Sequence, residues 1–164
     1  MYSFRNDYSE GAHPKVLQAL ADTNLRQTVG YGMDPCCQAA ADTIRRLCAA
    51  PDAAVHFLVG GTQVNLVTID AFLQSYEAVV AAQTGHVSTH ETGAIEATGH
   101  KVCTVESPDG KLTPALVESV LAGHNGTEHM VLPRIVYISD TTEIGTVYTR
   151  AELAALRQCC DVHG

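Results

Sequence analysis

The sequence predicts an α/β fold in which a mainly parallel sheet lies between two layers of helices, a three-layer α/β/α arrangement. Short apolar runs of strand length, such as AVVAA and RIVYIS, alternate with longer segments whose apolar residues recur at helical spacing. This alternation is typical of parallel strands joined by right-handed helical crossovers. Helices are therefore expected on both faces of the sheet.

The predicted elements follow one another in a regular order. The first two helices are expected at 14–24 and 34–50, the second with Asp34 as its N-cap and Pro35 at its first position. A last helix is expected at 149–160, capped by Thr149. Between these, strands are expected at 54–60, 77–82, 101–106 and 134–139, and helices at 62–74, 90–99 and 113–123.

Gly164 follows the last predicted helix at the position where a glycine commonly ends one. The alternating order then requires another buried strand, which the 164 residues do not contain. We therefore expect an incomplete sheet and a chain that is part of a larger protein.

Composition narrows the class of protein. With 46% hydrophobic and 17% charged residues, the 164-residue chain is globular and long enough to bury a core. Its net charge of −8 and ten scattered basic residues argue against nucleic acid as a partner. The apolar runs are too short to span a membrane, and the polar N-terminus does not resemble a signal peptide.

The six cysteines match neither a disulfide framework nor a C-x-x-C zinc pattern. They comprise two vicinal pairs, Cys36-Cys37 and Cys159-Cys160, together with Cys48 and Cys103. We expect a reducing, cytoplasmic location, with Cys159 and Cys160 acting as small buried hydrophobic residues.

The stretch GHVSTHETGAIEATGH, residues 85–100, is rich in histidine and glutamate. His86 and His90 are four residues apart, which on a helix would suggest a zinc site. Gly85 and the two β-branched residues around Ser88 argue against a helix at this point. A zinc enzyme using His86, His90 and Glu91 stays an alternative.

Three predicted loops are expected to converge, because the carboxyl ends of parallel strands share one edge of a sheet. The turn at 60–65 carries glycines that let the backbone approach an anion, followed by a helix N-terminus with free N–H groups. His86 follows strand 77–82, and the polar loop 139–146 follows strand 134–139. The convergence favours a binding site at this edge.

Four further histidines receive structural interpretations. His56 and His100 are expected to be solvated or to be satisfied at the edge of the core. His124 and His163 lie near predicted helix C-termini, where a positive imidazole interacts favourably with the helix dipole.

Five motifs, in order along the chain, resemble the N-terminal half of a threonine aldolase. They are FRNDYSEGAHP, VGYGMDP, GGTQVN, GHVSTHETGAIEATGHKV and YISDTTEIGT. The resemblance covers Tyr2 to Gly164 and implies the pyridoxal-phosphate (PLP) family of fold type I, which also includes β-eliminating lyases. It implies an N-terminal arm and helix at 1–25 and the first half of the large PLP-binding domain at 26–164. It also implies cleavage of threonine, or a similar β-hydroxy amino acid, to glycine and an aldehyde.

The resemblance also implies roles for individual residues. Gly61 and Thr62, with neighbouring amides, would bind the cofactor phosphate, and the ring of His86 would stack on the pyridine. Asn6 and Tyr31 would reach the substrate, and His86, His90 and His129 are candidates for the chemistry, since a histidine near the substrate hydroxyl is a natural base. The full set of cofactor-binding positions is Gly60, Gly61, Thr62, Asn65, His86 and Glu91.

Three groups of the family pattern lie beyond this sequence: the lysine that binds the cofactor covalently, an aspartate for the pyridine nitrogen, and an arginine for the substrate carboxylate. Lys15, Lys101 and Lys111 do not lie in the family's lysine context. We therefore expect residues 1–164 alone to be inactive, with activity residing in the longer protein, as a homodimer or homotetramer.

Other functions stay open at this point. One is a different PLP enzyme of fold type I, a β-eliminating lyase or an aminotransferase-like protein. Another is a nucleotide-binding α/β domain, although the G-x-G-x-x-G fingerprint is missing after 54–60. A purely structural role is the non-enzyme alternative.

Overall fold

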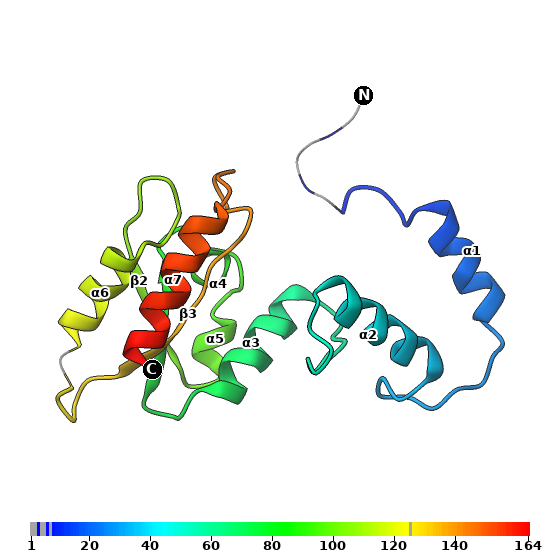
Figure 1. The fold of residues 1–164 in the computed structure, drawn as a ribbon, viewed down its shortest axis with the longest axis horizontal. Helices are drawn as coiled ribbons and strands as arrows, with labels where there is room; N and C mark the ends of the chain where they lie inside the picture. Colours follow the sequence, from blue (N-terminus) through cyan, green and yellow to red (C-terminus); the bar gives the residue numbers. More distant parts are fainter. Residues whose placement is uncertain (1–2, 4–5, 7, 125) are drawn as a thin grey trace. The chain divides into compact units, whose positions relative to one another are not determined.

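The computed structural model describes residues 3, 6, 8–124 and 126–164 (Figure 1). The chain divides into two compact units, Met1–Phe57 and Leu58–Gly164, which are described separately. This division does not test the predicted domain boundary after residue 25, which stays a prediction.

The N-terminal unit contains two helices, α1 (Pro14–Thr23) and α2 (Pro35–Leu47). The predicted cap of α2 is confirmed: the Asp34 carboxylate accepts hydrogen bonds from the N–H groups of Cys36 and Cys37, at 2.9 and 3.0 Å. Pro35 occupies the first helical position, where a missing N–H costs nothing. Ala41 is the only buried residue among the described residues of these two helices.

The C-terminal unit contains a parallel three-stranded sheet with the order β2-β1-β3. Its strands are β1 (Glu77–Ala82), β2 (Lys101–Val105) and β3 (Leu132–Val136). Its helices are α3 (Gly61–Phe72), α4 (His86–Thr89), α5 (Ala94–Ala97), α6 (Pro114–Gly123) and α7 (Arg150–His163). Strand β1 lies in the centre of the sheet, so the connection from β2 to β3 passes over it.

The central strand explains the three layers. Successive side chains of a strand point to opposite faces, so the side chains of EAVVAA pack into two hydrophobic clusters, one on each face of the sheet. Val79 and Ala81 pack with residues of α3, α4 and α5, including Ile69 and Ile95. Val80 and Ala82 pack on the other face with residues of α6 and α7 such as Val117. The predicted α/β/α arrangement is therefore confirmed for this part of the chain.

The strand predicted at 54–60 is wrong, since these residues form no strand in the structure. A strand exists only when its backbone groups bond to a neighbouring strand. This segment crosses the boundary between the two units at Phe57 and Leu58, and none of its described residues enters the sheet. The described sheet therefore has three strands instead of the four predicted.

The expectation that the sequence around Ser88 resists a helix is also wrong. His86–Thr89 forms the single helical turn α4, with His90 as its C-cap. The helix predicted at 90–99 is reduced to α5, since Thr92 and Gly93 adopt positive φ angles of 54° and 76° that no α-helix contains. Two one-turn helices joined by a left-handed turn therefore replace one longer helix.

An ion pair joins the last helix, α7, to the loop that follows β2. Thr149 and Glu152 form a reciprocal capping box at the start of α7, which confirms the predicted cap. The second oxygen of Glu152 accepts a hydrogen bond from the Lys111 Nζ at 2.6 Å. The Lys111 ammonium and the capping bonds from Thr149 lower the pKa of Glu152 from 4.5 to about 2.

This contact predicts a pH-dependent stability. Because the pKa of Glu152 is lower in the folded protein, its contribution is fully present above about pH 4.5 and is lost as the pH falls toward 2. Glu152→Gln should lower the free energy of unfolding at pH 7, and the difference from wild type should shrink below pH 4.5. Urea unfolding across this range measures it, with the exposed Glu143→Gln as control. A difference that does not depend on pH would contradict the assignment.

No helix among the described residues is long and apolar enough to cross a membrane. All six cysteines are present as free thiols. Of the two predicted to be buried, Cys159 is buried and Cys160 is only partly covered, while Cys103 is also buried.

Candidate functional site

The loops that follow the three strands meet at the carboxyl edge of the sheet. Thr84 follows β1, Gly110 follows β2 and Ile144 follows β3. A Cβ atom placed on Gly110 would lie 3.1 Å from the Ile144 Cγ1 and 3.3 Å from the Thr84 Oγ1. The predicted meeting of 139–146 with the loop after β1 is therefore confirmed, and the loop after β2, which the sequence interpretation omitted, joins them.

A buried carboxylate connects two helices at this edge. Glu91 is 3% exposed, and its Oε1 accepts hydrogen bonds from the Asn65 Nδ2 at 2.5 Å and from the His86 Nδ1 at 2.7 Å. Asn65 belongs to α3 and His86 begins α4, so residues that are 26 positions apart are joined through one oxygen atom. We call these three residues the Asn65–Glu91–His86 group.

The local backbone explains why Glu91 points inward. It follows the C-cap of α4 and precedes the left-handed Thr92 and Gly93, so the chain reverses direction around it. Ile95, immediately after this turn, is completely buried between α3 and the sheet. The turn and the apolar anchor together hold the carboxylate beneath His86.

The arrangement orients the imidazole of His86. An ionised carboxylate can only accept hydrogen bonds, so the Nδ1 of His86 carries the hydrogen and its Nε2 is left for other contacts. The side chain of His86 is 40% exposed while that of Glu91 is fully covered. The ring of His90 lies 5.6 Å away, centroid to centroid, tilted by 56°. The site therefore offers one fixed imidazole and a second one beside it.

One oxygen of this group has no partner. The Glu91 Oε2 is buried and forms no hydrogen bond with any described residue, and the same holds for the hydroxyl of Ser139 in the loop after β3. Unpaired buried polar atoms are costly, and in native proteins they are concentrated at functional sites. Tyr137, which sequence reasoning missed, adds a hydroxyl 3.5 Å from the Asn65 Nδ2.

The glycine turn before α3 fits an anion. Gly60 is the N-cap of α3 and supplies no side chain to its first N–H groups. A Cβ atom at Gly60 or at Gly61 would meet nothing within 4 Å, so the space above the helix start is open. Thr62 lies in the same first turn, and Asn65 follows in the second. The amides and the helix dipole at this end favour a negatively charged group.

Three further site predictions concern His129, Asn6 and Tyr31. His129 lies three residues before β3, at the amino end of the sheet and therefore opposite the loops that carry His86. Asn6 and Tyr31 belong to the N-terminal unit, where Asn6 accepts hydrogen bonds from Ser9 and Tyr8 and Tyr31 is fully exposed. The roles of these three residues stay predictions.

Two of the histidines without an assigned role, His100 and His124, have structural contacts. His100 is buried, with its Nδ1 3.3 Å from the Glu77 carbonyl oxygen and its Nε2 3.4 Å from Asp70, as expected of a satisfied core-edge residue. His124 caps the C-terminus of α6, where its Nδ1 donates to the Val120 carbonyl at 2.8 Å.

Comparison with known proteins identifies relatives over the whole chain. The sequence profile of the β-eliminating lyases matches residues 4–164. The low specificity L-threonine aldolases of Pseudomonas sp. (strain NCIMB 10558) and of Pseudomonas aeruginosa are 36% and 35% identical over 159 residues. Each alignment covers 96% of this chain and 45% of the relative.

A solved structure agrees with this relationship. The threonine aldolase of Leishmania major is 55% identical and superposes with a TM-score of 0.97, over 100% of this chain and 48% of that one. The chain thus spans less than half the length of these relatives. Since the family profile matches almost every residue, from the first motif to Gly164, the chain belongs to the β-eliminating lyase family.

Proposed function

We propose that the protein carrying this chain is a PLP-dependent lyase that cleaves the Cα–Cβ bond of threonine, or of a similar β-hydroxy amino acid, to give glycine and an aldehyde. Its relatives in two bacteria and in Leishmania major are threonine aldolases. The observation that carries the proposal is the Asn65–Glu91–His86 group, which fixes a half-exposed imidazole at the carboxyl edge of the sheet.

The described residues fit the cofactor. The free amides of Gly61 and Thr62 at the start of α3 would hold the phosphate, and the open space above Gly60 and Gly61 leaves room for it. The face of the His86 ring would lie against the pyridine, in a plane set by the hydrogen bond to Glu91. When bound, PLP supplies an electron sink for the charge that the broken bond leaves at Cα.

The residues of this chain would contribute orientation and proton transfer. Bond cleavage requires removal of the proton from the substrate hydroxyl, so a base must lie close to it. His90 is exposed beside the ring of His86 and is our candidate for holding this proton. Glu91 is a positioning residue, because it contacts His86 and Asn65 and is itself covered. Asn6 and Tyr31 would contact the substrate, and His129 is a further candidate for its hydroxyl.

A product assay on the full-length protein tests the proposed function. With PLP and threonine, we expect acetaldehyde and glycine in equal amounts, the aldehyde being measured through a coupled alcohol dehydrogenase. A β-eliminating activity would instead release pyruvate from serine or cysteine derivatives, and an aminotransferase would need a keto acid as second substrate. Either outcome without aldehyde formation would contradict the proposal.

The phosphate assignment gives a prediction of its own. Gly61→Val should weaken PLP binding by about tenfold to a hundredfold, because the side chain blocks the approach of a charged group whose hydrogen bonds contribute about 1.5–3 kcal/mol each. The fold should tolerate the change, since nothing lies within 4 Å of the added Cβ. Equilibrium dialysis measures the affinity.

Gly123→Val is the matched control, since it also lies in a helix and its Cβ would also meet nothing within 4 Å. Cofactor affinity that is equal in the two variants and in wild type would rule out the phosphate turn.

The proposed enzyme would be a cytoplasmic homodimer or homotetramer. The free cysteines are consistent with a reducing compartment. Light scattering on the purified full-length protein determines the number of subunits.

A further inference from the structure

The face of the sheet opposite Ile95 carries a second group of reactive side chains, between α6 and α7. Glu118 projects from α6, and Cys159 and His163 project from α7. One ligand atom from each residue lies within 4.8 Å of the other two. We propose that Glu118, Cys159 and His163 form a site for a divalent zinc ion that links the two helices.

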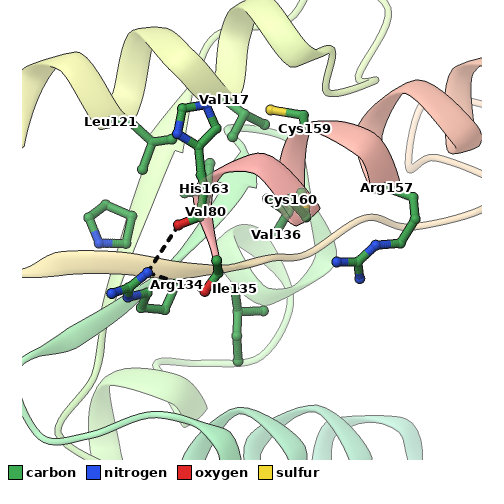
Figure 2. Close-up of a pocket in the computed structure, with 12 residues that line it drawn as sticks. Val80, Val117, Leu121, Arg134, Ile135, Val136, Arg157, Cys159, Cys160 and His163 are labelled. Carbon is green, nitrogen blue, oxygen red and sulfur yellow. Dashed lines mark hydrogen bonds between the residues drawn. The ribbon is translucent and has the colours of Figure 1, made fainter.

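The spacing on α7 brings two ligands to one side. Residues four apart on an α-helix are neighbours on its surface, so Cys159 and His163 face the same way. Figure 2 shows both residues on α7 beside Val117 and Leu121 of the neighbouring α6. In a tetrahedral zinc site with bonds of about 2.0–2.3 Å, ligand atoms lie about 3.5 Å apart. Bringing the three ligand atoms from 4.8 Å to this separation needs a shift of about 1 Å. Side-chain rotation of the exposed Glu118 and His163 can supply it.

The surroundings leave these ligands available. Among the described residues, no side-chain hydrogen bond or ion pair engages Glu118, Cys159 or the ring of His163, whereas the nearby Arg157 is paired with Asp161. Cys159 is 7% exposed, and the other two side chains reach the surface. A cavity of about 250 Å³ opens onto the three residues. It gives an ion access and leaves room for a water molecule as the fourth ligand.

The ligand set selects zinc over harder cations. Sulfur, nitrogen and oxygen ligands together suit zinc, while magnesium and calcium prefer oxygen alone. A thiolate and a carboxylate neutralise the two positive charges, and the neutral imidazole completes the protein ligands. Burial, together with the Glu118 carboxylate, holds the pKa of the Cys159 thiol above its usual value. The thiol thus carries its proton in the free protein, and zinc binding forms the S–Zn bond and releases that proton to the buffer.

Metal binding to the purified full-length protein tests the site. After removal of metals with a chelator, we expect one equivalent of Zn²⁺ to bind, with X-ray absorption showing one sulfur neighbour at about 2.3 Å. Bound Co²⁺ should show the d–d bands of a tetrahedral site. Cys159→Ser should weaken binding at least about a hundredfold and Glu118→Gln at least about tenfold. The adjacent Cys160→Ser is the matched control and should bind as wild type does.

Circular dichroism checks whether the Cys159→Ser variant folds. If it does not, the Glu118→Gln variant still tests the site, because Glu118 is exposed and its replacement should not disturb the core. Zinc without a sulfur neighbour, or equal affinities in wild type and Glu118→Gln, would overturn the proposal. So would the absence of stoichiometric zinc binding to the wild-type protein. Aldolase activity enters none of these measurements, so this site and the proposed function succeed or fail independently.

Discussion

Replacing His86 with alanine in the full-length protein is expected to lower kcat/KM for the proposed threonine cleavage by about a hundredfold. The cofactor would lose the surface that we propose fixes its plane, and small misplacements at a reacting centre cost rates of this order. His86→Phe should keep most of the cofactor affinity, since a phenyl ring also stacks on an aromatic face. It should still lose activity, because it cannot bond to Glu91, whose Oε1 lies 2.7 Å from the His86 Nδ1. Cofactor affinity by dialysis and the coupled aldehyde assay separate the two effects.

His56→Ala is the control for this experiment, since His56 is an exposed histidine to which we assign no role. If the alanine and phenylalanine variants behaved alike, with cofactor affinity equal to that of wild type, the stacking role of His86 would be wrong.

Ile95→Ala should reduce the free energy of unfolding by about 2–5 kcal/mol, the range for removing a large aliphatic side chain from a packed core. Ile95 is 0% exposed and packs with Ile69, Val79 and Val87, so the cavity cannot be filled by a local shift. Its helix α5 has only four residues, and its position depends on this anchor. Urea unfolding of the full-length protein measures the loss.

The matched control for that loss is Ile144→Ala, because Ile144 is 52% exposed and should change the free energy of unfolding by less than about 1 kcal/mol. Since Glu91 precedes α5 by only one turn, Ile95→Ala should also weaken cofactor binding. Equal losses of stability in the two variants would show that α5 does not anchor the site.

Local signals were sufficient for much of the fold. The run EAVVAA has the exact bounds of β1, because a strand buried on both faces is apolar throughout. Asp34 and Thr149 were predictable as caps, since their oxygen atoms bond to N–H groups only two or three residues away. Features determined by neighbours in the chain can be predicted from the chain.

Features determined by distant partners could not be predicted in this way. Residues 54–60 have the composition of a strand but pair with none of the three described strands. The one-turn helix at His86 lies below the length at which helical spacing is recognisable. The resemblance named Asn65, His86 and Glu91, yet only the structure shows that Asn65 and His86 bond to the same oxygen of Glu91. Only the structure shows that the Tyr137 hydroxyl lies beside Asn65.

The order β2-β1-β3 also has a consequence for how the protein folds. In the sheet Ala78 pairs with Lys101, whereas Glu77 pairs with the much later Leu132. Closing a loop of about 55 residues rather than about 23 costs roughly 0.8 kcal/mol more in chain entropy. The β1–β2 pair is therefore expected to form first, leaving the other edge of β1 open until β3 arrives. During synthesis on the ribosome, that open edge of the most apolar strand is where another chain could add in place of β3, so slow arrival of β3 favours aggregation.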